Sequence, residues 1–181
     1  PGSENDFGKN IIPSMLSAGE KLFAYPFSGY WKDVGTLQSL WEANMDLLGD
    51  KPAFRIRDGE WRIYSRSPVS PPHYAGEGCL IENSIVTEGC EIYGTIVNSV
   101  ISPDVTVEKG ALVRDSVIMS GAVIKANAVV NYSILDTNVT VGEGAFVGAD
   151  RNIARGITVL GSCYKAEQGV KIEDGSILSV K

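Results

Sequence analysis

Few residues in this sequence combine a reactive side chain with the spacing that catalysis or metal binding requires. There is one histidine, His73, and there are three cysteines, Cys79, Cys90 and Cys163, none of them in a Cys-x-x-Cys pair. An odd cysteine count without a neighbouring histidine disfavours a disulfide framework and a structural zinc site. Asp33 follows an aromatic stretch, and by itself it is typical of a turn or a solvated carboxylate.

The charge balance narrows the class of partner. The 181 residues include 16 Lys and Arg against 22 Asp and Glu, which gives a formal net charge of −6. Nucleic acid and anionic membrane surfaces would not be attracted to such a chain, so neither is expected as a partner. No window holds 18 uncharged apolar residues, and no basic-then-apolar signal segment begins the sequence. We therefore expect a cytoplasmic protein.

The elements that position these residues are indicated by an internal repeat. From Ile101 onward, aliphatic residues recur at positions 101, 107, 113, 118, 124, 130, 135, 141 and 147, so the repeating unit is 17 residues long. Such a short period is typical of a solenoid. One motif is written four times: Ser84-Ile85-Val86, Ser99-Val100-Ile101, Ser116-Val117-Ile118 and Ser133-Ile134-Leu135.

A second periodic feature indicates where each coil turns. Residue types that tolerate positive φ recur at one phase, at Gly89, Asp104, Gly110, Gly121, Asn127, Asn138, Gly144, Gly156 and Gly175. The residue after each is mostly small or β-branched, and Cys90, at one of these inward positions, is expected to be an inert core thiol. Short strands separated by such corners predict a triangular coil. A meander of short strands would have no reason to keep corner residues in phase.

The repeat is predicted to be irregular in two places. The first turn is 15 residues long, with aliphatic positions at 86, 92, 97 and 101. After Asp150 the phase is expected to continue at Ile153, Val159, Ile172 and Leu178. A loop leaving the stack is predicted within Gly161–Gly169.

The first 75 residues lack the repeat. Residues 22–27 and 30–34 predict two strands, and residues 60–64 predict a third. Thr36 is expected to cap a helix that ends near Gly49. These elements cannot form an independent core, so we expect a C-terminal portion of a longer protein. Trp31 and Trp41 are predicted to pack against a missing domain. Lys32 is predicted to form a surface or interdomain ion pair, and His73 to be a packing residue.

Three motifs in order resemble bacterial glucose-1-phosphate adenylyltransferases. They are Asp6-Phe7-Gly8-Lys9-Asn10-Ile11-Ile12-Pro13, then Gly29-Tyr30-Trp31-Lys32-Asp33-Val34-Gly35-Thr36, then Trp61-Arg62-Ile63-Tyr64-Ser65-Arg66 with Pro71-Pro72-His73-Tyr74. The resemblance implies a mainly β fold, a left-handed parallel β-helix of hexapeptide repeats preceded by a small α/β remnant of a Rossmann-like nucleotidyltransferase domain. The remnant would span residues 1–50, a linker with a short strand 51–78, and the β-helix 79–181.

The resemblance also implies a reaction. The family joins ATP to glucose 1-phosphate, giving ADP-glucose and pyrophosphate for glycogen synthesis, and its members assemble as homo-oligomers, typically tetramers. It implies that Asp33 is one of two carboxylates that hold Mg²⁺, which would neutralise the phosphates. The family's Gly-rich triphosphate loop and its Glu-Lys pair do not occur in this sequence. No catalytic residue is therefore assigned, substrate-binding residues stay unknown, and the chain alone is expected to be inactive.

Other functions remain open at this stage. A non-catalytic regulatory paralogue would share this architecture, and another sugar-phosphate nucleotidyltransferase would differ mainly outside this sequence. Hexapeptide acyltransferases use a histidine base, and no histidine follows His73, which excludes them here. Some members of the family bind anionic effectors, and the resemblance makes Lys165, Lys171 and Lys181 candidates for such a site.

Overall fold

A computed structural model of the chain describes residues 4–56, 59, 60, 64 and 69–180. It forms two compact units, Pro1–Trp31 and Lys32–Lys181. In the first unit, the π-helical turn η1 (Phe7–Ile11) leads into helix α1 (Ile12–Ser17), and the Asp6 carboxylate caps the turn by accepting from the Lys9 N–H at 2.7 Å. Across the described ranges, no helix is long and apolar enough to cross a membrane.

The two strands predicted within residues 22–34 are wrong. This stretch has no regular secondary structure, and its large apolar side chains lie in solvent, with Phe23 90% and Tyr25 88% exposed. A strand is stabilised by hydrogen bonds to a neighbouring strand, and none of the described segments pairs with this one. Most of the third predicted strand, residues 60–64, lies outside the described residues.

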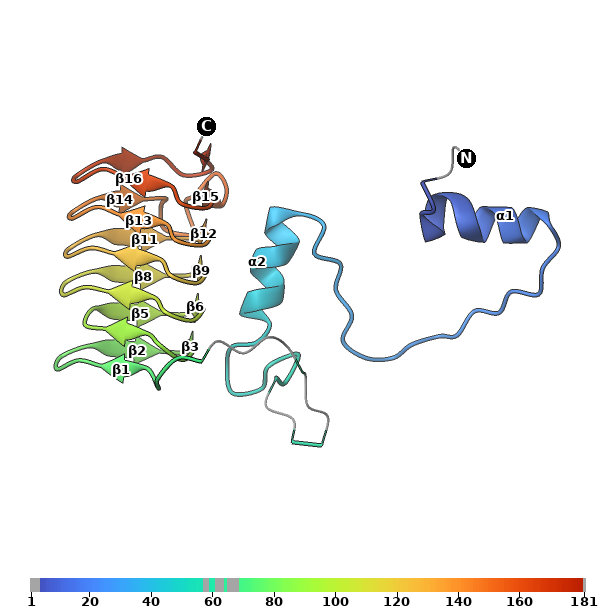
Figure 1. The fold of residues 1–181 in the computed structure, drawn as a ribbon, viewed down its shortest axis with the longest axis horizontal. Helices are drawn as coiled ribbons and strands as arrows, with labels where there is room; N and C mark the ends of the chain where they lie inside the picture. Colours follow the sequence, from blue (N-terminus) through green and yellow to red (C-terminus); the bar gives the residue numbers. More distant parts are fainter. Residues whose placement is uncertain (1–3, 57–58, 61–63, 65–68, 181) are drawn as a thin grey trace. The chain divides into compact units, whose positions relative to one another are not determined.

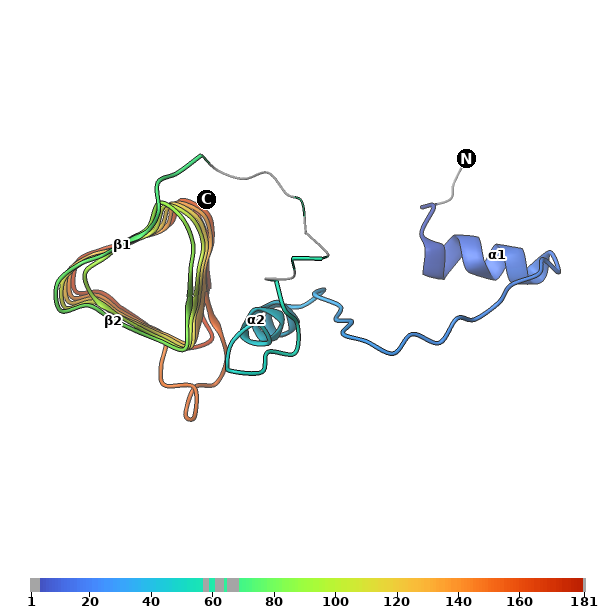
Figure 2. The ribbon, with the colours of Figure 1, turned by 90° about the horizontal axis from the view of Figure 1, so that it is seen from below.

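Residues 74–178 form a three-sided parallel β-helix, with three six-stranded sheets along its sides (Figures 1 and 2). The first sheet contains β1 (Tyr74–Ala75), β4 (Glu91–Ile92), β7 (Thr106–Val107), β10 (Val123–Ile124), β13 (Thr140–Val141) and β16 (Lys165–Ala166). The second contains β2 (Leu80–Glu82), β5 (Thr95–Val97), β8 (Leu112–Arg114), β11 (Val129–Asn131), β14 (Phe146–Val147) and β17 (Lys171–Ile172). The third contains β3 (Ile85–Val86), β6 (Val100–Ile101), β9 (Val117–Ile118), β12 (Ser133–Leu135), β15 (Thr158–Leu160) and β18 (Ile177–Leu178).

The predicted solenoid core is confirmed. Ile101 pairs with Ile118 and Ile118 with Leu135 in parallel register, and all three side chains are fully buried in one column. The other two sheets contribute equivalent inward columns of buried side chains. Figure 2 shows the triangular outline of the coils that enclose them. Burial raises the pKa of the Cys90 thiol, which is 1% exposed, as expected of an inert core cysteine.

Positive φ at the corners is also confirmed, including 71° at Gly121 and 63° at Gly144. Of the nine predicted corner residues, Gly156 alone lacks it. The third corner of the predicted triangular coil lies between the second and third sheets, and most of its left-handed residues are not among the nine predicted ones. Its left-handed residues precede the repeated Ser-aliphatic motif, and they are Asn83, Asn98, Asp115 and Tyr132.

The serine of each repeat has a structural function at this third corner. The Ser116 hydroxyl donates to the Arg114 carbonyl at 2.6 Å and accepts from the Ser133 N–H at 3.1 Å. Ser99 makes the same two bonds one coil earlier, so the hydroxyls form a buried ladder. Because these groups are buried, the ladder satisfies corner backbone that the parallel sheets leave unpaired.

Two details of the predicted phase are corrected. In the short first turn, Ile96 and not Val97 points inward, because the corner before β5 has two residues where its counterparts have four. The loop that leaves the stack is residues 148–157 and not Gly161–Gly169, which contains the regular strand β16. Ile153 in that loop is 79% exposed, and Leu160 occupies the inward position next to the predicted Val159. Ile172 lies in the core cluster and Leu178 packs against it, as predicted.

Candidate functional site

Asp33 lies in the segment that leads into helix α2 (Leu37–Met45), and its side chain is exposed. Its Oδ1 accepts from the Gly35 N–H at 3.0 Å, which closes a tight turn. The next residue, Thr36, is the predicted helix cap: its Oγ1 accepts from the Ser39 N–H, and the Ser39 hydroxyl accepts from the Thr36 N–H, each at 3.1 Å. The capping box fixes how the chain enters α2.

Lys32, on the other side of Asp33, is tied to the same helix. Its Nζ lies 2.9 Å from Asp46 Oδ2 and 3.2 Å from Glu42 Oε2, which confirms the predicted ion pair. The hydrogen bond to Asp46 raises the pKa of Lys32, and the hydrogen bond from Gln38, followed by that from Lys32, lowers the pKa of Glu42. Residues on both sides of Asp33 are thus bonded to α2.

Helix α2 is anchored on the β-helix by Trp41. Its side chain is 1% exposed, and its Nε1–H donates to the Asp115 carbonyl at 2.7 Å. It packs with the outward-facing side chains of the third sheet, among them Val117 and Ile134. The prediction that Trp41 packs against a missing domain is therefore wrong, because the outer face of the third sheet buries it. Trp31, by contrast, is 77% exposed.

The residue types near Asp33 fit a magnesium ligand only in part. A carboxylate is the hard oxygen donor that Mg²⁺ prefers, and the Asp33 side chain is accessible to solvent. Within the described residues, however, no group of three or more His, Cys, Asp or Glu side chains could hold a metal ion. Asp33 could thus supply one ligand of a site whose other ligands come from elsewhere.

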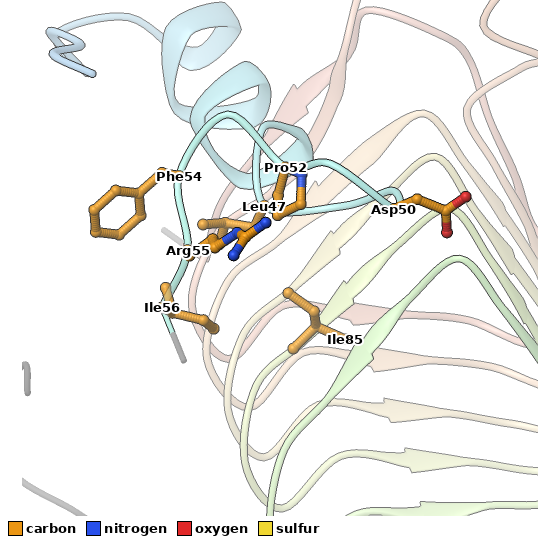
Figure 3. A pocket seen from close by; sticks show the side chains of 7 residues that line it. All are labelled: Leu47, Asp50, Pro52, Phe54, Arg55, Ile56 and Ile85. Carbon is orange, nitrogen blue, oxygen red and sulfur yellow. The ribbon is translucent and has the colours of Figure 1, made fainter. Parts of the chain in front are cut away.

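A hollow of about 350 Å³ lies between the segment after α2 and the start of the third sheet (Figure 3). Ile56 and Ile85 face each other across it, and the Asp50 carboxylate points away from the other labelled side chains. Arg55 is the one cation among its described lining residues. Its described lining residues include no convergent polar groups of the kind that catalysis needs, and Asp33 is not among them.

The remaining candidates do not form a site together. His73 is exposed, so the prediction that it is a packing residue is wrong. Lys165 and Lys171 lie on different sheets, in β16 and β17, and Lys171 pairs with Glu173 at 3.4 Å. Lys181 lies outside the described residues.

Comparison with known families explains both parts of the chain. Residues 72–172, more than half of the sequence, match the family described as "GlmU-like, C-terminal hexapeptide". The chain belongs to this hexapeptide family. Residues 1–50 match the family described as "Nucleotidyl transferase". These matches confirm the predicted fold class, a hexapeptide β-helix that follows part of a nucleotidyltransferase domain.

Individual relatives have names that are more specific than the two family descriptions. A protein of Clostridium botulinum is 59% identical over 87 residues, which is 48% of this chain and 22% of the relative. One from Clostridium perfringens is 58% identical over 88 residues, 49% of this chain and 23% of the relative. Both are named glucose-1-phosphate adenylyltransferase, which confirms the resemblance drawn from the motifs. The match spans less than a quarter of each relative's length.

Proposed function

We propose that this chain acts as part of a glucose-1-phosphate adenylyltransferase, which makes ADP-glucose and pyrophosphate from ATP and glucose 1-phosphate. The observation that carries the proposal is the joint occurrence of a nucleotidyltransferase segment and a hexapeptide β-helix in a chain that is 56–59% identical, over 87–88 residues, to relatives with that name. Residues 1–50 would complete the nucleotidyltransferase domain, and the predicted linker, 51–78, would lead into the β-helix, whose first strand is β1 (Tyr74–Ala75).

Asp33 is the residue we assign to the chemistry, as a ligand of Mg²⁺. The ion would neutralise the phosphates of the two anionic substrates when bound. The assignment is supported by the exposed carboxylate and by the bonds that fix its neighbours Lys32 and Thr36 to α2. Asp33 itself would orient one oxygen toward the ion while its Oδ1 keeps the turn closed through Gly35.

The test is Asp33→Asn in the polypeptide that joins this chain to a complete nucleotidyltransferase domain. The amide keeps the shape of the side chain and its acceptor for Gly35, but it removes the charge. We expect an unchanged melting temperature and a turnover reduced by about 10²-fold or more, or ~2.7 kcal/mol of transition-state stabilisation. Near-normal turnover at saturating Mg²⁺ would remove Asp33 from the metal site.

The same experiment separates the catalytic enzyme from a regulatory paralogue. A paralogue would make no ADP-glucose in the unmodified polypeptide, so Asp33→Asn would change nothing. The present chain alone should be inactive in either case, because one carboxylate cannot replace a triphosphate loop and a sugar-phosphate lysine. We further infer a homo-oligomer that works in the cytoplasm, where thiols such as Cys79, Cys90 and Cys163 stay reduced.

A further inference from the structure

Tyr132 has a backbone conformation that its residue type disfavours. Its φ is 43°, in the left-handed region, where a bulky aromatic residue is unusual. The equivalent corners of three earlier coils use Asn83, Asn98 and Asp115, which tolerate this conformation. Strain of this kind persists only where other contacts maintain it, so the contacts of the Tyr132 side chain indicate what it does.

Those contacts are with helix α2. The Tyr132 ring meets the Trp41 ring edge to face, with centroids 5.0 Å apart and planes at 86°. Its hydroxyl donates to Gln38 Oε1 at 3.2 Å. Gln38 Nε2 donates in turn to Glu42 Oε1 at 2.9 Å, and Glu42 pairs with Lys32. A continuous chain of bonds therefore runs from a corner of the β-helix to the residue before Asp33.

The loop 148–157 covers Trp41 from a second direction. The corresponding corners of the other coils have one to four residues, so this is the long exception among the described corners. Arg151 lies over the Trp41 ring, with its Cζ 4.7 Å from the ring centroid, and Ile157 belongs to the same buried cluster. Asp150 shapes the loop by accepting from the N–H groups of Asn152 and Ile153.

We propose that Tyr132 and Arg151 are positioning residues, through which the β-helix holds α2 and thereby orients the Asp33 segment. The proposal rests on the proposed function for the role of Asp33, but the docking of α2 is independent of it. Trp41 is the shared anchor, since both residues contact its ring. The polar chain through Gln38 transmits the orientation to Lys32.

Hydrogen exchange of the chain tests the docking without any enzymatic readout. Tyr132→Asn removes the ring and relieves the strained corner, so the melting temperature of the β-helix should hold or rise. Amide exchange in residues 32–46 should nevertheless accelerate about tenfold, because the helix loses its clamp. Arg151→Leu should accelerate the same amides, whereas Arg114→Leu, on the second sheet, should not.

Activity in the complete polypeptide tests the connection to the metal. Tyr132→Asn and Arg151→Leu should raise the half-saturating Mg²⁺ concentration about threefold or more, with turnover recovering at high Mg²⁺, and Arg151→Lys should restore part of the loss. Unchanged exchange in residues 32–46 would overturn the proposal whatever the enzyme does. Faster exchange with an unchanged Mg²⁺ dependence would overturn the connection to Asp33. In that case Asp33→Asn would still decide the proposed function separately.

Discussion

At the scale of single residues, serine hydroxyls stabilise the β-helix by bonding to buried backbone groups at the corner between the second and third sheets. The hydroxyls of Ser99, Ser116 and Ser133 repeat one pattern, each donating to the carbonyl two residues earlier. No buried side-chain nitrogen or oxygen in the described part of the chain lacks a hydrogen-bond partner. The repeated serine therefore satisfies backbone groups at this corner.

Ser116→Ala should measure the strength of this ladder. The change leaves the buried Ser133 N–H without its acceptor, which costs about 1–3 kcal/mol. Ser84→Ala is the matched control, because Ser84 makes the same two bonds but is only half-buried, so water can substitute. Equal losses in urea unfolding of the two variants would contradict a contribution from burial.

Alanine substitutions at two corner glycines should distinguish the cost of backbone strain from the cost of a steric clash. Gly144→Ala would place its Cβ in open space, so it should cost the left-handed strain alone, roughly 1–2 kcal/mol. At Gly121 a Cβ would lie 2.4 Å from Asn138 Oδ1, so Gly121→Ala should cost more. Thermal unfolding should show the larger shift for Gly121, and an unchanged melting temperature for both would refute the left-handed corners.

At the scale of elements, the loop 148–157 is held in place by two arginine contacts. Arg151 holds its early part against Trp41, and Arg155 attaches its later part to the last coil. The Arg155 guanidinium donates to both oxygens of Asp174, at 3.1 and 3.0 Å, and its backbone N–H bonds the same carboxylate. These contacts hold the loop against Trp41 of α2.

The ion pair between Arg155 and Asp174 predicts that the stability of the fold depends on pH in the acid range. The hydrogen bonds from Arg155 lower the pKa of Asp174 from 3.8 to about 2. A carboxyl that releases its proton more readily in the folded state stabilises the fold above pH 3.8, and this stabilisation is lost as the pH falls through about 2. The Asp174→Asn variant should therefore have a lower melting temperature than the unmodified chain near neutral pH. The two melting temperatures should converge near pH 2.

Glu173→Gln is the control for that prediction. Glu173 is 60% exposed and lies 3.7 Å from Arg155, so removing its charge should change the melting temperature little. A difference between Asp174→Asn and the unmodified chain that stays constant down to pH 2 would show that the Asp174 charge does not stabilise the fold.

At the scale of the whole molecule, large apolar side chains remain in solvent. On the outer face of the second sheet, Leu80 is 49% and Phe146 37% exposed, and they share one register column with Leu112 and Val129. In the first unit, Phe27 is 65% exposed. Surfaces of this kind are typical of sites that another chain covers.

We predict that the chain is a homo-oligomer in solution. Burial of these apolar surfaces between copies would supply the free energy of association. Light scattering at tens of micromolar should give a multiple of 19.4 kDa. A monomer mass under those conditions would contradict the prediction, and high salt is the control because apolar association should survive it.

The sequence by itself determined the β-helix. A residue in a solenoid packs against its equivalents one coil away, so a 17-residue period specifies the column of Ile101, Ile118 and Leu135 and the corners at Gly121 and Gly144. The cap at Thr36 was equally predictable, because its partner Ser39 lies three residues away. In each case the deciding interaction repeats or is local.

Only the tertiary structure decided what is neither periodic nor local. Trp41 donates to a carbonyl 74 residues away, and no spacing in the sequence indicates that partner. Tyr132 departs from the Asn and Asp of its corner for the same reason, since its contacts lie on α2. The stretch 22–34 has strand-forming residues but no strand, because a strand exists only when another backbone pairs with it. Pairwise contacts between distant segments depend on how the elements dock, and docking is a property of the folded molecule.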